Sequence, residues 1–144
     1  MSRESFREVQ KFTQWWLWLL LLSLGIILIY NQAANLGALI LVVISLLFLS
    51  LRLITEVDKK GIKFHYFPFL KRAYKWQEIA SAQVVDYGFA GGWGIRLYTP
   101  YGTIYNVKGS KGLAVELKNG KKFCLGTQKP EALQKLLSSI NLQK

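Results

Sequence analysis

The pattern of hydrophobic and polar residues divides the chain into two parts. No charged residue occurs in residues 12–51, and Leu, Ile, Val and Trp would occupy every face of a helix built from them. A helix of about 20 apolar residues spans the core of a bilayer, which is about 30 Å thick. The run is long enough for two such helices, and the polar residues 31–35 mark a turn between them. The pattern therefore predicts a transmembrane hairpin, with helices over residues 12–30 and 33–51.

Aromatic and basic residues give this hairpin an orientation. Trp15, Trp16 and Trp18 cluster at one end of the first helix and Tyr30 lies at the other, as in the aromatic belts of membrane proteins. Basic residues occur on both flanks of the run and are absent from the turn. Since basic residues mark the cytoplasmic side of a membrane protein, both termini are expected in the cytoplasm.

The sequence after the hairpin is typical of β-strands. Residues 62–67 are rich in aromatic and branched side chains, and Asp58-Lys59-Lys60-Gly61 before them indicates a tight turn. Residues 1–11 are interpreted as a cytoplasmic extension of the first helix. The expected organisation is a cytoplasmic segment over residues 1–11, a membrane hairpin over 12–54 and a β-rich cytoplasmic domain over 55–144.

The hairpin at Asn119-Gly120 has a register that the apolar positions decide. A two-residue loop would place Leu117 opposite Lys122 and mix the faces. A three-residue loop, Lys118-Asn119-Gly120, pairs Val115 with Phe123 and Leu113 with Leu125. This loop needs a left-handed residue in a bulge, which glycine accepts readily. The buried face therefore predicts the three-residue loop.

The end of the chain has the pattern of an amphipathic helix. Pro130 suits the first turn of a helix. Leu133, Leu136, Leu137 and Ile140 follow at helical spacing and form one apolar stripe. The stripe is expected to pack on the sheet.

The composition excludes most catalytic chemistry. The chain has 144 residues, with one Cys and one His. These numbers exclude a disulfide framework, a cysteine zinc site and any convincing nucleophilic triad. We expect no enzyme, no metal and no cofactor. The net charge of +11 suits a nucleic acid, but no nucleic-acid motif is present and the membrane anchor accounts for the charge, so no nucleic-acid partner is expected.

The order of these elements resembles the bacterial PH-like membrane proteins. Lys75-Trp76-Gln77-Glu78-Ile79 is similar to the W-x-E-I element that those domains carry after their third strand. Three further runs are similar to a subgroup of two-span proteins: Gly91-Gly92-Trp93-Gly94-Ile95-Arg96, Tyr105-Asn106-Val107 and Gly126-Thr127-Gln128-Lys129-Pro130. The resemblance implies about seven antiparallel strands in an open barrel, capped by the C-terminal helix. It also implies a bacterial inner membrane and a domain that binds lipid headgroups, peptides or proteins.

Three basic residues are candidates for binding an anion. Lys108 and Lys111 flank a glycine-rich turn, whose backbone N–H groups would add to their two charges. The turn lacks the spacing of a P-loop, and the alternative is a solvated hairpin tip. Arg96 is the best single candidate for a specific anion contact, and the alternative is an ordinary surface charge.

A second group of residues is a candidate for contact with a membrane surface or a partner. Trp93, among glycines and near Phe89, would form a mobile aromatic loop, or else a tight turn with Trp93 in the core. The densest basic clusters would orient the domain on an anionic surface, or else reflect an ordinary cytoplasmic excess of charge. Their candidate residues are Lys59, Lys60, Lys63, Lys71 and Arg72.

The sequence thus favours a non-enzymatic, membrane-tethered PH-like module. It would recognise a partner protein or anionic lipid headgroups at the inner leaflet. The alternative is a structural subunit of a homo-oligomer or of a larger membrane complex.

Overall fold

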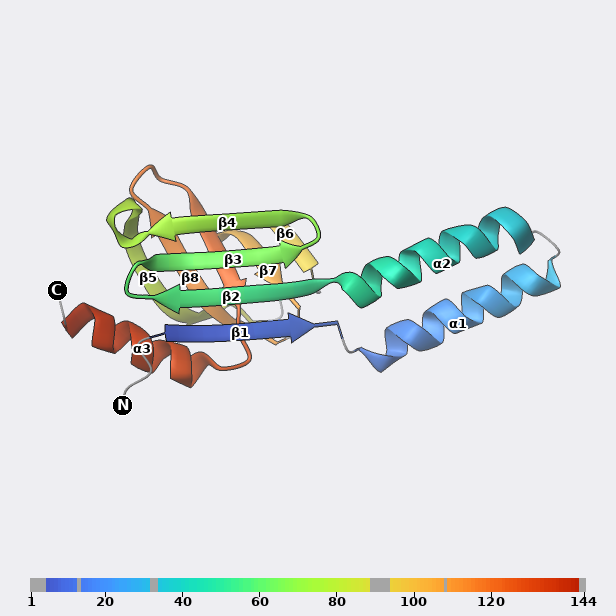
Figure 1. The fold of residues 1–144 in the computed structure, drawn as a ribbon, viewed down its shortest axis with the longest axis horizontal. Coiled ribbons are helices and arrows are strands. Elements are labelled where there is room, and N and C mark those ends of the chain that lie inside the picture. Colours follow the sequence, from blue (N-terminus) through green and yellow to red (C-terminus); the bar gives the residue numbers. More distant parts are fainter. Residues whose placement is uncertain (1–4, 13, 32–33, 89–93, 108, 143–144) are drawn as a thin grey trace. The chain divides into compact units, whose positions relative to one another are not determined.

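The structure is a computed structural model that describes residues 5–12, 14–31, 34–88, 94–107 and 109–142 (Figure 1). It divides into two compact units. One unit joins Met1–Gln10 to Arg52–Lys144, and the other is Lys11–Leu51. The chain therefore leaves the first unit after its N-terminal strand and returns to it after the helical hairpin.

The smaller unit is a pair of helices, α1 (Trp15–Tyr30) and α2 (Ala34–Ser50). They pack at Gly37, where an added Cβ would lie 2.9 Å from the Leu28 Cδ2 atom. Phe12 and Phe48 meet edge to face with ring centroids 6.0 Å apart. Many apolar side chains on both helices are exposed.

The structure contradicts the predicted transmembrane helices. α1 has 16 residues and α2 has 17, so at 1.5 Å per residue they extend only about 24 and 26 Å, less than the bilayer core of about 30 Å. Among the residues described, no helix combines enough length with enough apolar character to cross a membrane. The helices are shorter than the uncharged run because α1 begins only at Trp15 and the helical backbone is interrupted at Asn31. This finding contradicts two predictions, the membrane hairpin and the location in the inner membrane.

The larger unit contains two β-sheets and a C-terminal helix, α3 (Pro130–Leu142). The first sheet has the order β1-β2-β3-β4, with strands Ser5–Lys11, Arg52–Asp58, Gly61–Phe67 and Leu70–Lys75. A short 3-10 turn, η1 (Trp76–Glu78), leads to the second sheet. That sheet has the order β5-β8-β9-β7-β6, with strands Ile79–Asp86, Lys111–Leu117, Lys122–Gly126, Gly102–Asn106 and Gly94–Thr99.

The predicted open barrel of about seven antiparallel strands is wrong. The described part of the chain has nine strands in two separate sheets. Strand β9 lies between β8 and β7 in the second sheet. Its pairing with β7 is parallel, with Thr103 of β7 opposite Phe123 of β9. The strand count rises chiefly because the N-terminal segment, expected as a helical extension, forms β1 beside β2 (Figure 1).

Strand β1 connects the two ends of the chain. Its inward residues are Phe6, Glu8 and Gln10, all buried. The Glu8 carboxylate accepts hydrogen bonds from the Thr127 hydroxyl at 2.6 Å and from the backbone N–H of Gln128 at 2.8 Å. The Gln10 side chain donates to the carbonyl of Gly126 at 2.6 Å. Buried polar groups are stable only when they are hydrogen-bonded, so β1 and the segment before α3 depend on each other.

Two local predictions are confirmed. Strands β8 and β9 pair Val115 with Phe123 and Leu113 with Leu125, as the three-residue loop requires. Gly120 in that loop has φ +87, a value that favours glycine. In α3 the predicted apolar stripe is buried: Leu133, Leu136, Leu137 and Ile140.

The W-x-E-I segment has a structural role at the junction of the two sheets. The Trp76 indole N–H donates to the carbonyl of Asp58 at 2.8 Å, and the Glu78 carboxylate accepts from the backbone N–H of Lys75 at 2.8 Å. These contacts fix η1 against the β2–β3 turn. The segment therefore shapes the fold.

Buried groups with raised pKa values predict a loss of stability at alkaline pH. Burial raises the pKa of the Cys124 thiol from 9.0 to about 12, and that of the Tyr66 phenol from 10.0 to about 12. Burial, and then the nearby Cys124 and Asp86, raise the pKa of Tyr87. These groups ionise more readily in the unfolded chain, so their stabilisation is complete below about pH 9 and is lost as the pH rises towards 12.

Urea denaturation between pH 7 and 11 measures this loss. We expect the free energy of unfolding to fall by a few kcal/mol over that range. In Cys124→Ala, which removes the group with the lowest unfolded pKa, the fall should begin nearer pH 10 than pH 9. If stability begins to fall at the same pH in both proteins, the Cys124 thiol does not contribute to the loss of stability.

Candidate ligand-binding pocket

The structure separates the residues predicted to bind an anion. Lys108 lies outside the described residues, as do Phe89 and Trp93. Arg96 is on β6 and Lys111 is on β8, with β7 and β9 between them. At about 4.8 Å per strand these two strands are about 14 Å apart. Arg96 and Lys111 therefore do not form one anion site.

The predicted surface cluster divides into a turn and a strand surface. Lys59 and Lys60 lie in the β2–β3 turn, where the Asp58 carboxylate accepts from the backbone N–H groups of Lys60 at 2.8 Å and Gly61 at 3.0 Å. The predicted residues Lys63, Lys71 and Arg72 do come together. With Arg7, Glu56 and His65 they line a cavity of about 330 Å³ on the four-stranded sheet, which we call the sheet-face depression.

A larger cavity lies between the two sheets. Its volume is about 560 Å³, and we call it the aromatic pocket. Strand β4 forms one side with Arg72 and Tyr74, and strands β6, β7 and β9 form the other. The remaining lining residues are Phe64, Leu97, Tyr98, Gly102, Thr103, Tyr105, Leu117, Lys121, Lys122 and Phe123.

Four aromatic rings form the wall of this pocket. The Phe64 ring centroid is 4.9 Å from that of Tyr105 and 5.3 Å from that of Phe123. Tyr74 stacks on Phe123 with centroids 5.1 Å apart. Phe64 and Phe123 are buried, whereas Tyr74 and Tyr105 are half-buried. The packed rings hold the wall in place and leave two tyrosine side chains accessible to a ligand.

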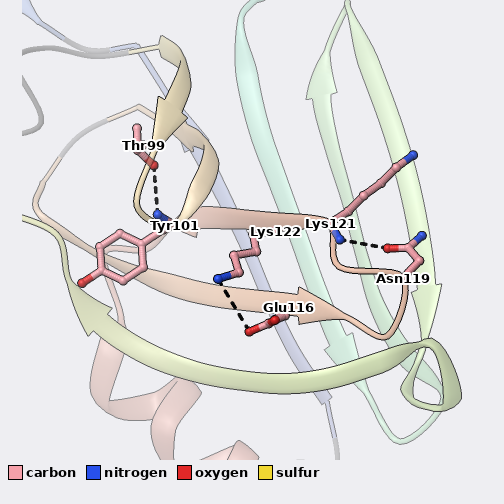
Figure 2. Close-up of polar contacts among 6 residues, drawn as sticks. All are labelled: Thr99, Tyr101, Glu116, Asn119, Lys121 and Lys122. Atoms are coloured by element: carbon pink, nitrogen blue, oxygen red, sulfur yellow. Dashed lines mark hydrogen bonds and ion pairs between the residues drawn. The ribbon is translucent and has the colours of Figure 1, made fainter.

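Among the described residues that line this pocket, the only charged side chains are cationic. Arg72 and Lys121 form no ion pair with any carboxylate in the part of the chain that the structure describes. Lys122 is 4.0 Å from Glu116, a weak surface pair. Figure 2 shows the Lys121 and Lys122 side chains leaving the β8–β9 hairpin in different directions. Arg72 and Lys121 therefore have their full charge available for an anion.

Tyr98 stands at the edge of the pocket in an unusual conformation. Its φ is +60 and its side chain is 99% exposed. The β6–β7 register shifts between Arg96 and Thr99, so Tyr98 lies in an irregularity of the edge strand. The Thr99 hydroxyl secures the following turn, since it donates to the carbonyl of Gly102 at 2.6 Å and accepts from the backbone N–H of Tyr101 (Figure 2). A bulky residue at positive φ costs roughly 1–3 kcal/mol, and such strain clusters at ligand sites.

The Tyr105 hydroxyl remains a hydrogen-bond donor in this pocket. Burial, and then the neighbouring Tyr74, raise the pKa of Tyr105, and the Arg72 charge opposes that shift. The phenol is therefore neutral at physiological pH. A neutral phenol and a guanidinium together suit an anionic group.

The described lining of the pocket consists of aromatic, apolar, hydroxyl and cationic groups. Its described lining contains no carboxylate, histidine or cysteine. In the segments that the structure describes, no three His, Cys, Asp or Glu side chains are grouped to hold a metal ion. The arrangement can hold an anion beside an apolar or aromatic group.

Of the cationic residues that line the pocket, only Arg72 is a candidate binding residue from the sequence. Arg72 belongs to a predicted basic cluster, but Lys121 has the pattern of a solvated hairpin end. The strain at Tyr98 has no signal in the sequence. The pairing of β9 with β7 brings Lys121 and Tyr105 to one pocket. No pattern in the sequence indicates that pairing.

Comparison of the chain with protein-family models, with curated proteins and with solved structures found no match to any of them. The resemblance to PH-like proteins therefore stays a prediction.

Proposed function

We propose that the β-rich unit is a binding module for a ligand that carries a negative charge on an aromatic or apolar group. The supporting observation is the aromatic pocket, which combines accessible tyrosine rings with the cations Arg72 and Lys121. Within the described residues these cations have no carboxylate partner and the pocket has no acidic lining residue. Ligand sites are typically concave, mostly apolar and provided with a few oriented polar groups.

The charged contacts set the expected affinity differences. A hydrogen bond to a charged group contributes about 1.5–3 kcal/mol, which is about 10-fold to 100-fold in binding. An anion held by both Arg72 and Lys121 therefore depends on each of them. The rings add apolar contact area, so an aromatic anion should bind better than a bare one.

Calorimetric titration of the full-length chain with phenyl phosphate tests this proposal. The experiment needs a mild detergent that covers the exposed apolar side chains of α1 and α2. We expect phenyl phosphate to bind more tightly than inorganic phosphate or phenol. Arg72→Ala and Lys121→Ala should each weaken binding about tenfold or more.

Lys118→Ala is the matched control, because Lys118 is exposed on the same hairpin and does not line the pocket. It removes one positive charge, as the two test variants do. Equal weakening in all three variants would indicate diffuse attraction and contradict a specific site. Absence of binding by phenyl phosphate would also contradict the proposal.

A further inference from the structure

We infer that the ligand of this module is an extended acidic segment of a partner protein, which adds as a strand to the free edge of β4. This inference rests on the proposed function, because it places one side chain of that segment in the aromatic pocket. Three features of β4 carry it: its edge position, the cavities on its two faces, and its charge.

Strand β4 is an edge strand with one paired side. In the described residues it is hydrogen-bonded to β3 only, from Gly61 opposite Lys75 to Tyr66 opposite Leu70. The backbone groups on its other side thus lack a strand partner there. An extended peptide binds such an edge through main-chain hydrogen bonds.

The two faces of β4 each border a cavity. Arg72 and Tyr74 line the aromatic pocket, while Lys71 and Ala73 line the sheet-face depression. The long Arg72 side chain borders both. Successive side chains of a strand point to opposite faces. A strand added beside β4 would therefore direct alternate side chains towards the pocket and towards the depression.

The charge of this edge selects an acidic strand. Lys71, Arg72 and Lys75 are three of the six residues of β4. Among the described lining residues of both cavities, the only carboxylate is that of Glu56, which is paired with Arg7 at 3.0 Å. Lysine at an edge also protects a strand from pairing, but protection alone does not require a cavity on each face. Acidic side chains over Lys71, and an aromatic side chain with a negative charge in the pocket, would satisfy both cavities.

The test uses the full-length chain in mild detergent and a capped peptide of sequence Glu-Val-Glu-phosphotyrosine-Glu-Val-Glu, whose phosphotyrosine carries a negative charge on an aromatic ring. Two derivatives of it carry two backbone N-methyl groups each and are isomers of one another, one methylated at the two inner glutamates and the other at both valines. In an added strand only one of these sets of N–H groups faces β4. We therefore expect one isomer to lose binding by about tenfold or more while the other stays close to the parent.

Hydrogen exchange adds an independent measurement. Backbone amides of Leu70–Lys75 should exchange more slowly when the parent peptide is bound. Lys71→Ala, outside the aromatic pocket, should weaken the peptide about tenfold and leave phenyl phosphate unchanged. Lys118→Ala should leave both ligands unchanged.

The outcomes separate this inference from the proposed function. If both methylated isomers bind like the parent, or if the peptide fails while phenyl phosphate binds, strand addition is overturned and the pocket remains an anion site. If neither ligand binds, both proposals are overturned. Selective loss with one isomer, together with slower exchange in β4, supports both.

Discussion

Replacing Phe6, Glu8 and Gln10 together by alanine should unfold the β-rich unit at room temperature. Phe→Ala in a core costs about 3–5 kcal/mol. Loss of the Glu8 carboxylate leaves the buried Thr127 hydroxyl without its acceptor, at about 1–3 kcal/mol, and also removes the part-buried hydrogen bond from the Gln128 N–H. The sum is comparable to the whole stability of a typical domain, about 5–15 kcal/mol.

The opposite face of the same strand provides the matched control. Ser5, Arg7 and Val9 are exposed, and the Arg7–Glu56 ion pair lies at the surface, with a typical worth of about 0–1 kcal/mol. Their triple alanine variant should lose little stability. Limited proteolysis and urea denaturation would compare the two variants. Equal stability of the two would show that β1 is dispensable.

Removing the helical hairpin should leave a folded domain. Strands β1 and β2 are neighbours in one sheet and run in opposite directions (Figure 1). A chain that joins Lys11 to Arg52 through a four-residue Gly-Asn-Gly-Ser turn would make them an ordinary β-hairpin, whose loops are commonly about two to five residues long. The unit formed by Met1–Gln10 and Arg52–Lys144 would keep its core.

Circular dichroism, exchange-protected amides and a cooperative urea transition would identify the folded product. The comparison is a fragment of residues 52–144, which keeps all of β2 and lacks both the hairpin and β1. We expect the joined chain to fold and the fragment to remain unfolded or aggregate. A joined chain without a cooperative transition would show that α1 and α2 are required for the fold.

The apolar positions predict the local elements well. The β8–β9 register follows from pairing Leu113 with Leu125, and α3 follows from one apolar stripe. In both cases the partners are close in sequence, so spacing alone decides the structure. The helical pair also follows from the apolar pattern, but the uncharged run overstates the length of the helices because α1 begins only at Trp15 and the helical backbone is interrupted at Asn31.

Strand β1 escapes prediction for a physical reason. Its buried face consists of Phe6 and two polar residues, Glu8 and Gln10. A strand is normally recognised by alternating apolar residues, and here that alternation is replaced by hydrogen bonds to residues more than a hundred positions away. The aromatic pocket escapes similarly, because its two sides come together through sheet topology.

The hydrogen bonds of β1 also constrain the order in which the domain can form. They join residues separated by 116, 119 and 120 positions. Strand β1 is synthesised more than a hundred residues before its partners at Gly126, Thr127 and Gln128. Contacts of such long range form slowly, and the polar groups on the inward face of β1 lack these partners until residues 126–128 have been made. Folding of this domain therefore waits for those residues, and a chaperone that shields β1 would act on the nascent chain.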